Sequence, residues 1–163
     1  QTRIPSPGEY LYEPSGAVVR AHLVQELAQE LGANLIDPHL AYLTAAEAVQ
    51  SPLAQCYEVL EEIPVHEKQL KKWVRERGFT ALTIKKRGVD LVPEKLRATL
   101  LAGGAGKKSG KKAAKNQGYN PATLVFTRVG SGQQARRIGW YVRPVDFSDA
   151  AQVSSSDTKN SVV

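Results

Sequence analysis

The second half of the chain alternates short apolar segments with helical ones, and this alternation limits the fold more than any other feature. Four short segments rich in β-branched and aromatic residues predict strands. They cover residues 57–63, 79–86, 123–129 and 137–145. Two segments with apolar residues three and four positions apart predict helices. They cover residues 66–77 and 94–101. The predicted order is therefore β-α-β-α-β-β.

The connections between these segments indicate how the strands pair. A helix separates the strands at 57–63 and 79–86, which favours parallel pairing with a right-handed crossover. Gly130-Ser131-Gly132 joins the strands at 123–129 and 137–145, which predicts an antiparallel hairpin. We therefore expect an α+β fold in which an open mixed sheet carries helices against it.

The N-terminal part of the chain predicts a mainly helical segment. Two prolines and a glycine predict an irregular lead-in over residues 1–13. Apolar residues then recur every four positions, which predicts one amphipathic helix beginning at Pro14 and ending at Gly32. Residues 35–43 predict short strands around a turn, and Thr44 is expected to cap a short helix over 44–48.

Composition divides the chain into three predicted parts. Residues 1–52 form the N-terminal segment, and residues 53–145 form an α/β domain. An insertion rich in Lys, Gly and Ala interrupts that domain at residues 102–121, and its length and composition predict mobility. Residues 146–163 form a polar tail that lacks apolar periodicity.

Charge is segregated along the chain, although the net charge is only +6. Residues 1–63 carry two basic and nine acidic side chains. Residues 64–144 carry nineteen basic and four acidic side chains. A cationic block of this density is typical of a surface that meets phosphates or acidic proteins.

The sequence lacks the residue patterns of several kinds of catalytic site. One cysteine, Cys56, and three scattered histidines give no metal-ligand cluster, and Cys56 is expected to be a packed thiol. Residues 105–112 resemble a phosphate-binding P-loop only superficially, because Lys112 replaces its Ser or Thr and a helix precedes it. No Gly-rich turn links a leading strand to a helix, as a dinucleotide or S-adenosylmethionine site requires. We therefore predict no catalytic residue, no metal and no bound cofactor in this chain.

Ten cations in three groups are the candidate ligands of nucleic-acid phosphates. They are Lys85, Lys86 and Arg87, then Lys107, Lys108, Lys111 and Lys112, and finally Arg128, Arg136 and Arg137. Arg87 is the best candidate for a bidentate phosphate contact, since a planar guanidinium matches phosphate geometry. Two other interpretations remain open: the lysine-rich insertion serves solubility, and the cations of 66–77 form a solvated helix face. Binding of a nucleic acid requires the candidate cations to converge on one surface.

Two stretches of the sequence resemble a known family. Gly8-Glu9-Tyr10-Leu11-Tyr12-Glu13-Pro14 is similar to the segment that follows the catalytic domain in a bacterial family of class I S-adenosylmethionine-dependent methyltransferases. Residues 57–61, 84–90 and 123–129 resemble the THUMP-like domain that ends those proteins. Together the resemblance covers roughly residues 8–145.

The resemblance implies an accessory module that binds structured RNA, either tRNA or rRNA, and presents it to a catalytic domain absent from this chain. S-adenosylmethionine is then implied for that domain, which would be a partner in cis. The lack of any Met agrees with a fragment of a longer protein, and the lack of a long apolar run predicts no membrane segment. A cytoplasmic location is expected. The alternative function is a non-catalytic scaffold that packs on the methyltransferase domain.

Overall fold

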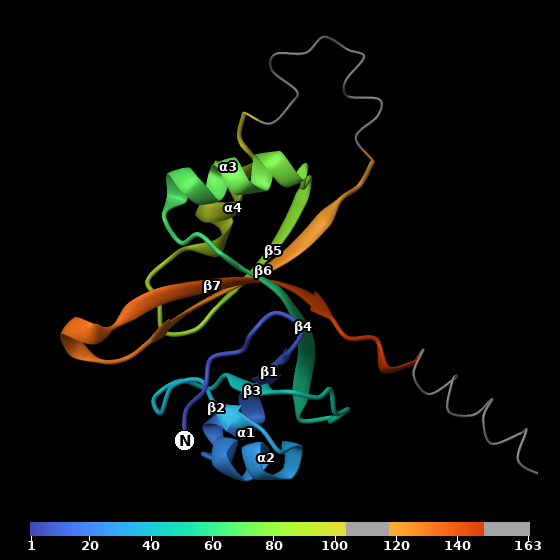
Figure 1. The fold of residues 1–163 in the computed structure, drawn as a ribbon, viewed down its shortest axis with the longest axis vertical. Helices are drawn as coiled ribbons and strands as arrows, with labels where there is room; N and C mark the ends of the chain where they lie inside the picture. The colour runs from blue at the N-terminus through green and yellow to red at the C-terminus, as the bar shows by residue number, and fades with distance from the viewer. Residues whose placement is uncertain (104–117, 149–163) are drawn as a thin grey trace, which may run out of the picture.

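Seven strands form one mixed sheet in the order β2-β3-β1-β4-β7-β6-β5 (Figure 1). The computed structural model describes residues 1–103 and 118–148. The strands are β1 (Tyr10–Pro14), β2 (Asn34–Leu35), β3 (Leu43–Ala45), β4 (Ala54–Ile63), β5 (Ala81–Lys86), β6 (Pro121–Val129) and β7 (Arg136–Pro144). The helices are α1 (Gly16–Arg20), α2 (Val24–Leu31), α3 (Glu67–Arg77) and α4 (Pro93–Leu101).

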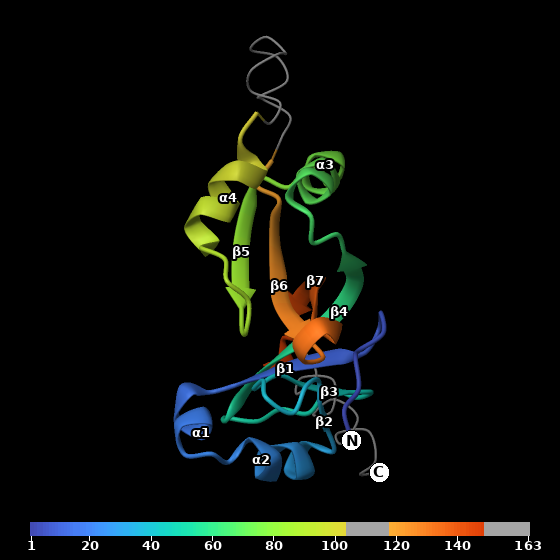
Figure 2. The same cartoon turned by 90° about the vertical axis from the view of Figure 1, so that its left-hand side faces the viewer.

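From β4 onward the helices and strands have the order that the sequence predicts. The proline at the start of α4 and the left-handed Gly78 after α3 mark helix ends as expected, with Gly78 at φ +69°. Both helices pack over one face of β5 and β6, and their apolar side chains form a core cluster with those strands (Figure 2). Trp73 and Leu70 of α3 contribute to this cluster, so Trp73 is a core residue.

One predicted strand pairing is wrong. β4 and β5 run in the same direction but are not neighbours, because β7 and β6 lie between them. The predicted hairpin of β6 and β7 forms, and β7 then pairs antiparallel with β4 while β6 pairs parallel with β5. The long hairpin therefore supplies each of the two earlier strands with a partner that lies far away in sequence.

The expected irregular lead-in is also wrong where it reaches β1. This strand lies inside the sheet and pairs antiparallel with both β3 and β4, with Leu11 opposite Thr44 on one side and Tyr57 on the other. Pro14 ends this strand instead of beginning a helix. Strand pairing on both sides compensates for the poor strand signal of this segment.

The single helix predicted from Pro14 to Gly32 is two helices. Ser15 caps α1, and the chain then turns at His22, whose φ of +57° is left-handed, before α2 begins. Gly32 ends α2 as predicted, with φ +63°. The predicted helix cap at Thr44 is wrong, because Thr44 lies in β3 and its hydroxyl donates to the carbonyl of Tyr10. The short strands expected around a turn at 35–43 are confirmed as β2 and β3.

The sheet crosses the predicted boundary at residue 52. A core cluster joins Leu11, Ile36 and Tyr42 of the N-terminal segment to side chains of β4, β6 and β7. Trp140 of β7 is in this cluster and is 1% exposed. On the other side of β1 and β3, α1 and α2 pack over Tyr12, Leu43 and Cys56. The N-terminal segment therefore extends the sheet and covers part of its core.

Candidate nucleic-acid interface

Lys85 and Arg87 point toward the N-terminal segment and bind it. The Lys85 ammonium lies 3.1 Å from the Glu13 carboxylate, and the Arg87 guanidinium donates to the carbonyls of Ala41 (2.9 Å) and Pro14 (3.0 Å). Burial alone lowers the pKa of Lys85, but the hydrogen bond to Glu13 raises it above its usual value. The expectation that Arg87 is open to a bidentate phosphate contact is therefore wrong, since both terminal nitrogens of its fork bind carbonyls.

Three other candidates surround the turn that follows β5. Lys86 donates from Nζ to the carbonyl of Val89 (3.3 Å), and Arg137 donates weakly to the carbonyl of Asp90 (3.4 Å). Arg128 is the direct cross-strand partner of Arg137. Its Nε lies 3.4 Å from the position that a Cβ on Gly88 would occupy. Within the described part of the chain, none of these three cations forms an ion pair with a carboxylate.

Arg136 lies on the opposite face of the hairpin from Arg137. Its cross-strand partner is Val129, which belongs to the core cluster around Trp140, whereas Arg137 lines a groove on the helix side. Side chains alternate along a strand, so adjacent arginines must point to different faces. The candidate cations therefore divide between two faces, and Lys86, Arg128 and Arg137 share one of them.

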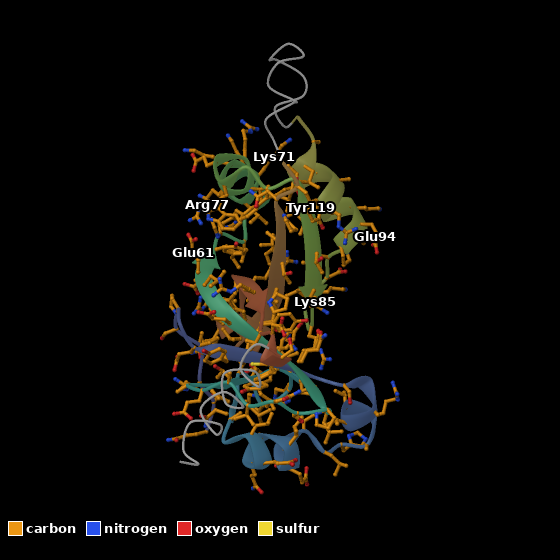
Figure 3. The ribbon with its side chains drawn as sticks, turned by 90° about the vertical axis from the view of Figure 1, so that its right-hand side faces the viewer. Glu61, Lys71, Arg77, Lys85, Glu94 and Tyr119 are labelled. Atoms are coloured by element: carbon orange, nitrogen blue, oxygen red, sulfur yellow. The ribbon has the colours of Figure 1, made fainter. Side chains whose placement is uncertain are left out.

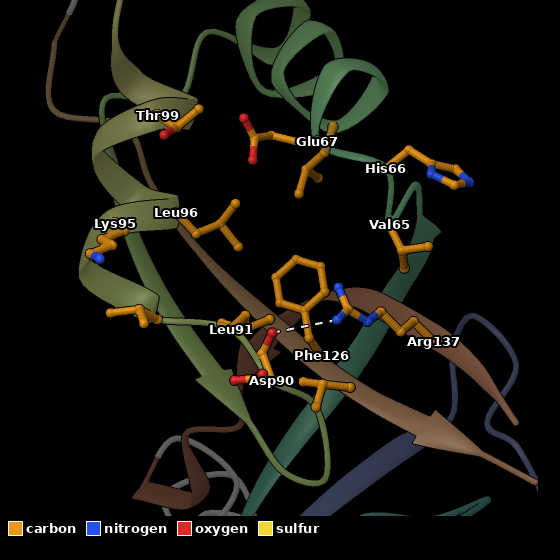
Figure 4. A pocket seen from close by; sticks show the side chains of 13 residues that line it. Val65, His66, Glu67, Asp90, Leu91, Lys95, Leu96, Thr99, Phe126 and Arg137 are labelled. Carbon is orange, nitrogen blue, oxygen red and sulfur yellow. Dashed lines mark hydrogen bonds between the residues drawn. The ribbon is translucent and has the colours of Figure 1, made fainter. Parts of the chain in front are cut away.

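One of these three cations, Arg137, lines a groove of about 480 Å³ (Figure 4). It lies between α3, α4 and the turn after β5, and Phe126 and Leu96 are among its apolar lining. Lys95 of α4 and Arg137 of β7 belong to its lining and lie on opposite sides of it in Figure 4. The groove also holds the Glu67 and Asp90 side chains, so its own charge is balanced. An apolar floor with guanidinium and ammonium groups at its edge can receive a base or sugar beside a phosphate.

The structure adds an exposed aromatic residue that the sequence did not single out. Tyr119 is 82% exposed, and Figure 3 shows it at the end of the molecule that also carries Lys71 and Arg77 of α3. Its neighbour Asn120 donates from its side chain to the carbonyls of Arg77 (3.3 Å) and Gly78 (3.1 Å). These bonds hold the backbone beside Tyr119 against the C-terminal end of α3. The sequence signal was an aromatic residue directly after a lysine-rich stretch.

Several residues predicted from the sequence lie outside the described part of the chain. These are Lys107, Lys108, Lys111 and Lys112. Among the described residues, no group of three or more His, Cys, Asp and Glu side chains is arranged to hold a metal ion. The helices in residues 1–103 and 118–148 are too short or too polar to traverse a bilayer.

A family comparison identifies the unit that carries the groove. Residues 54–144 match the family model described as THUMP domain-like. The chain belongs to this THUMP domain-like family. The match begins with β4 and ends with β7, so Lys86, Arg128, Arg137 and the groove all lie within the THUMP-like unit. The resemblance predicted from the sequence is confirmed.

Relatives of this THUMP-like protein are much longer than the chain itself. Two proteins from strains of Mycobacterium tuberculosis, both named "uncharacterized S-adenosylmethionine-dependent methyltransferase", are 30% identical over 84% of this chain and 34% of their own length. A crystal structure of a "putative methyltransferase" from Porphyromonas gingivalis shares the fold, with a TM-score of 0.61 and 22% identity over 88% of this chain and 32% of that one. The chain thus spans about one third of each relative.

The THUMP-like unit buries its cysteine, which predicts slow thiol chemistry. Burial raises the pKa of Cys56 to about 11 from 9.0, and the side chain is 6% exposed. Below pH 9 the thiolate fraction is therefore roughly 100-fold smaller than for an ordinary thiol. We expect Cys56 to react with a disulfide reagent at pH 8 at least about 100-fold more slowly than the urea-unfolded chain. Equal rates in the two states would contradict the buried position.

Proposed function

We propose that this chain is the RNA-recognition module of an S-adenosylmethionine-dependent methyltransferase. Its relatives carry the methyltransferase name, and this chain spans only about one third of their length, which supports a catalytic domain elsewhere in a longer protein. The turn between β4 and α3 contains Pro64 and Val65 but no glycine, so these residues do not fit the phosphate- or methionine-binding turns of cofactor domains. We assign the methyl donor to that other domain.

The observation that carries the proposal is the group of Lys86, Arg128 and Arg137 around one turn. The hydrogen bonds of Lys86 and Arg137 to carbonyls are long, so a phosphate oxygen could replace those partners at small cost. The groove that Arg137 lines offers space for an unstacked base or a ribose. Structured RNA, such as tRNA or rRNA, supplies both groups. The cytoplasm, where such RNA is modified, is the proposed location.

Replacing Arg137 by glutamate is expected to weaken binding of a structured RNA roughly tenfold, which is about 1.4 kcal/mol. The salt dependence should also become shallower by about one unit in the log–log slope, because one phosphate contact is lost. Filter binding or fluorescence anisotropy at several salt concentrations measures both quantities. The full chain and one fixed tRNA transcript should be used throughout.

Arg136→Glu is the matched control for this test. It makes the same charge change at the adjacent residue, but on the opposite face of the hairpin, where the side chain is exposed. The part of the affinity loss that comes from long-range electrostatic attraction should therefore be small and equal in the two variants. Only Arg137→Glu should show the additional loss from a missing phosphate contact. If Arg136→Glu weakens binding as much as Arg137→Glu does, the proposed face is wrong. RNA binding that is insensitive to salt would remove the basis of the function itself.

A further inference from the structure

A second groove lies on the N-terminal segment, far along the chain from Arg128 and Arg137. It has a volume of about 360 Å³ and is lined by Ala17, Val18, Leu23, Leu27 and Leu53, with Glu26 and Glu30 beside them. Its apolar walls come from α1, α2 and the turn before β4. Val18 and Leu27 form a buried floor, while Leu23 and Leu53 are 47% and 43% exposed.

Both exposed leucines occupy positions whose backbone role does not require an apolar side chain. Leu23 is the N-cap of α2 and makes no side-chain capping bond, although Ser, Thr, Asp and Asn are preferred there. Leu53 lies in the turn before β4 and accepts a backbone hydrogen bond from Ser15 through its carbonyl, which needs no apolar side chain. Apolar side chains at such positions are typical of an interface.

The charge around the groove indicates the chemistry of its partner. Glu26 and Glu30 are exposed beside it, and residues 1–53 carry two basic and six acidic side chains. A partner with an apolar projection and basic residues around it would complement this surface. RNA does not fit, because an acidic apolar groove repels phosphates.

We propose that the groove formed by Leu23, Leu53, Val18 and Leu27 docks the methyltransferase domain of the longer protein. This inference rests on the proposed function. The relatives continue for about two thirds of their length beyond the part that matches this chain. The match to them covers 84% of the chain and so extends beyond the THUMP-like unit at 54–144. Docking through the N-terminal segment would leave the groove beside Arg137 free to receive RNA.

The test uses Leu23→Ser and Leu53→Ser together. Both side chains are about half exposed, so the double variant should change the thermal stability of this chain alone only slightly. Hydrogen exchange should be compared between this chain and the longer protein in which it is joined to the methyltransferase domain. We expect amides of α2 to exchange at least about tenfold more slowly in the longer protein, and the double variant to abolish that difference.

Val92→Ser is the matched control. Val92 is also an exposed apolar N-cap, 48% exposed at the start of α4, and it lines the groove beside Arg137 instead of this one, so it serves as a control for α2 protection alone. It should leave the protection of α2 unchanged. Docking would be overturned if the amides of α2 exchanged at equal rates in this chain and in the longer protein. It would also be overturned if light scattering showed that this chain is a dimer and that the double variant is a monomer. RNA affinity is measured in parallel and should not change in the double variant, so failure of docking and failure of the RNA function remain distinguishable.

Discussion

Replacing Arg87 by alanine is expected to lower the free energy of unfolding by about 3 kcal/mol, while RNA affinity changes little. The guanidinium joins the end of β5 to two backbone carbonyls, those of Ala41 and Pro14, and lies 5.2 Å from the Tyr42 ring centre. Removing it leaves two partly buried carbonyls without a donor, and each such loss costs roughly 1–3 kcal/mol. Urea unfolding followed by tryptophan fluorescence measures the change.

Two further variants make this result specific. Arg87→Lys keeps the charge but cannot place two donors on two carbonyls, so it should recover less than half of the lost stability. Arg136→Ala removes an exposed arginine and should change stability by less than about 0.5 kcal/mol. If Arg87→Ala instead leaves stability intact and weakens RNA binding, the internal role of Arg87 is wrong.

The fate of Arg87 shows why sequence reasoning identified the cations but not their partners. A run of three cations at a strand end predicts a phosphate site when the neighbouring segment is unknown. In the structure β1 lies beside this run. The sequence around β1 contains prolines and a glycine, and it therefore predicted an irregular lead-in. The carbonyl of Pro14 was therefore not anticipated as a partner for Arg87. Side-chain alternation correctly predicted that Lys85 and Arg87 point to one face of the sheet and Lys86 to the other.

The types of the elements in the THUMP-like unit could be predicted because their apolar periods are local properties of the chain. Sheet order could not, because the pairing of β4 with β7 and of β5 with β6 depends on contacts between distant segments. The groove beside Arg137 was missed for the same reason. Its lining comes from α3, α4, β6 and β7, and no short stretch of sequence contains it.

Removing residues 1–52 is expected to abolish cooperative folding, even though the family match begins at residue 54. The deletion takes away Leu11, Ile36 and Tyr42, which are at most 3% exposed and pack in one cluster with Trp140. Losing each of these side chains costs roughly 3 kcal/mol. The sum approaches the whole stability of an ordinary domain, about 5–15 kcal/mol. The deletion also strips β4 of its β1 partner and creates an open apolar edge.

The readout is the environment of Trp140, which is 1% exposed in the intact chain. In the fragment 53–148 the tryptophan fluorescence, to which Trp73 also contributes, should shift to the red, and the urea transition should lose its sigmoidal shape. The full chain should show a sigmoidal transition and unshifted fluorescence. Adding the peptide 1–52 in trans should restore a cooperative transition, because β1 and the apolar residues it brings are what the fragment lacks. A fragment that unfolds cooperatively, with a buried tryptophan, would instead show that the THUMP-like unit is an independent domain. The N-terminal segment would then be an attachment to the sheet and not a part of its core.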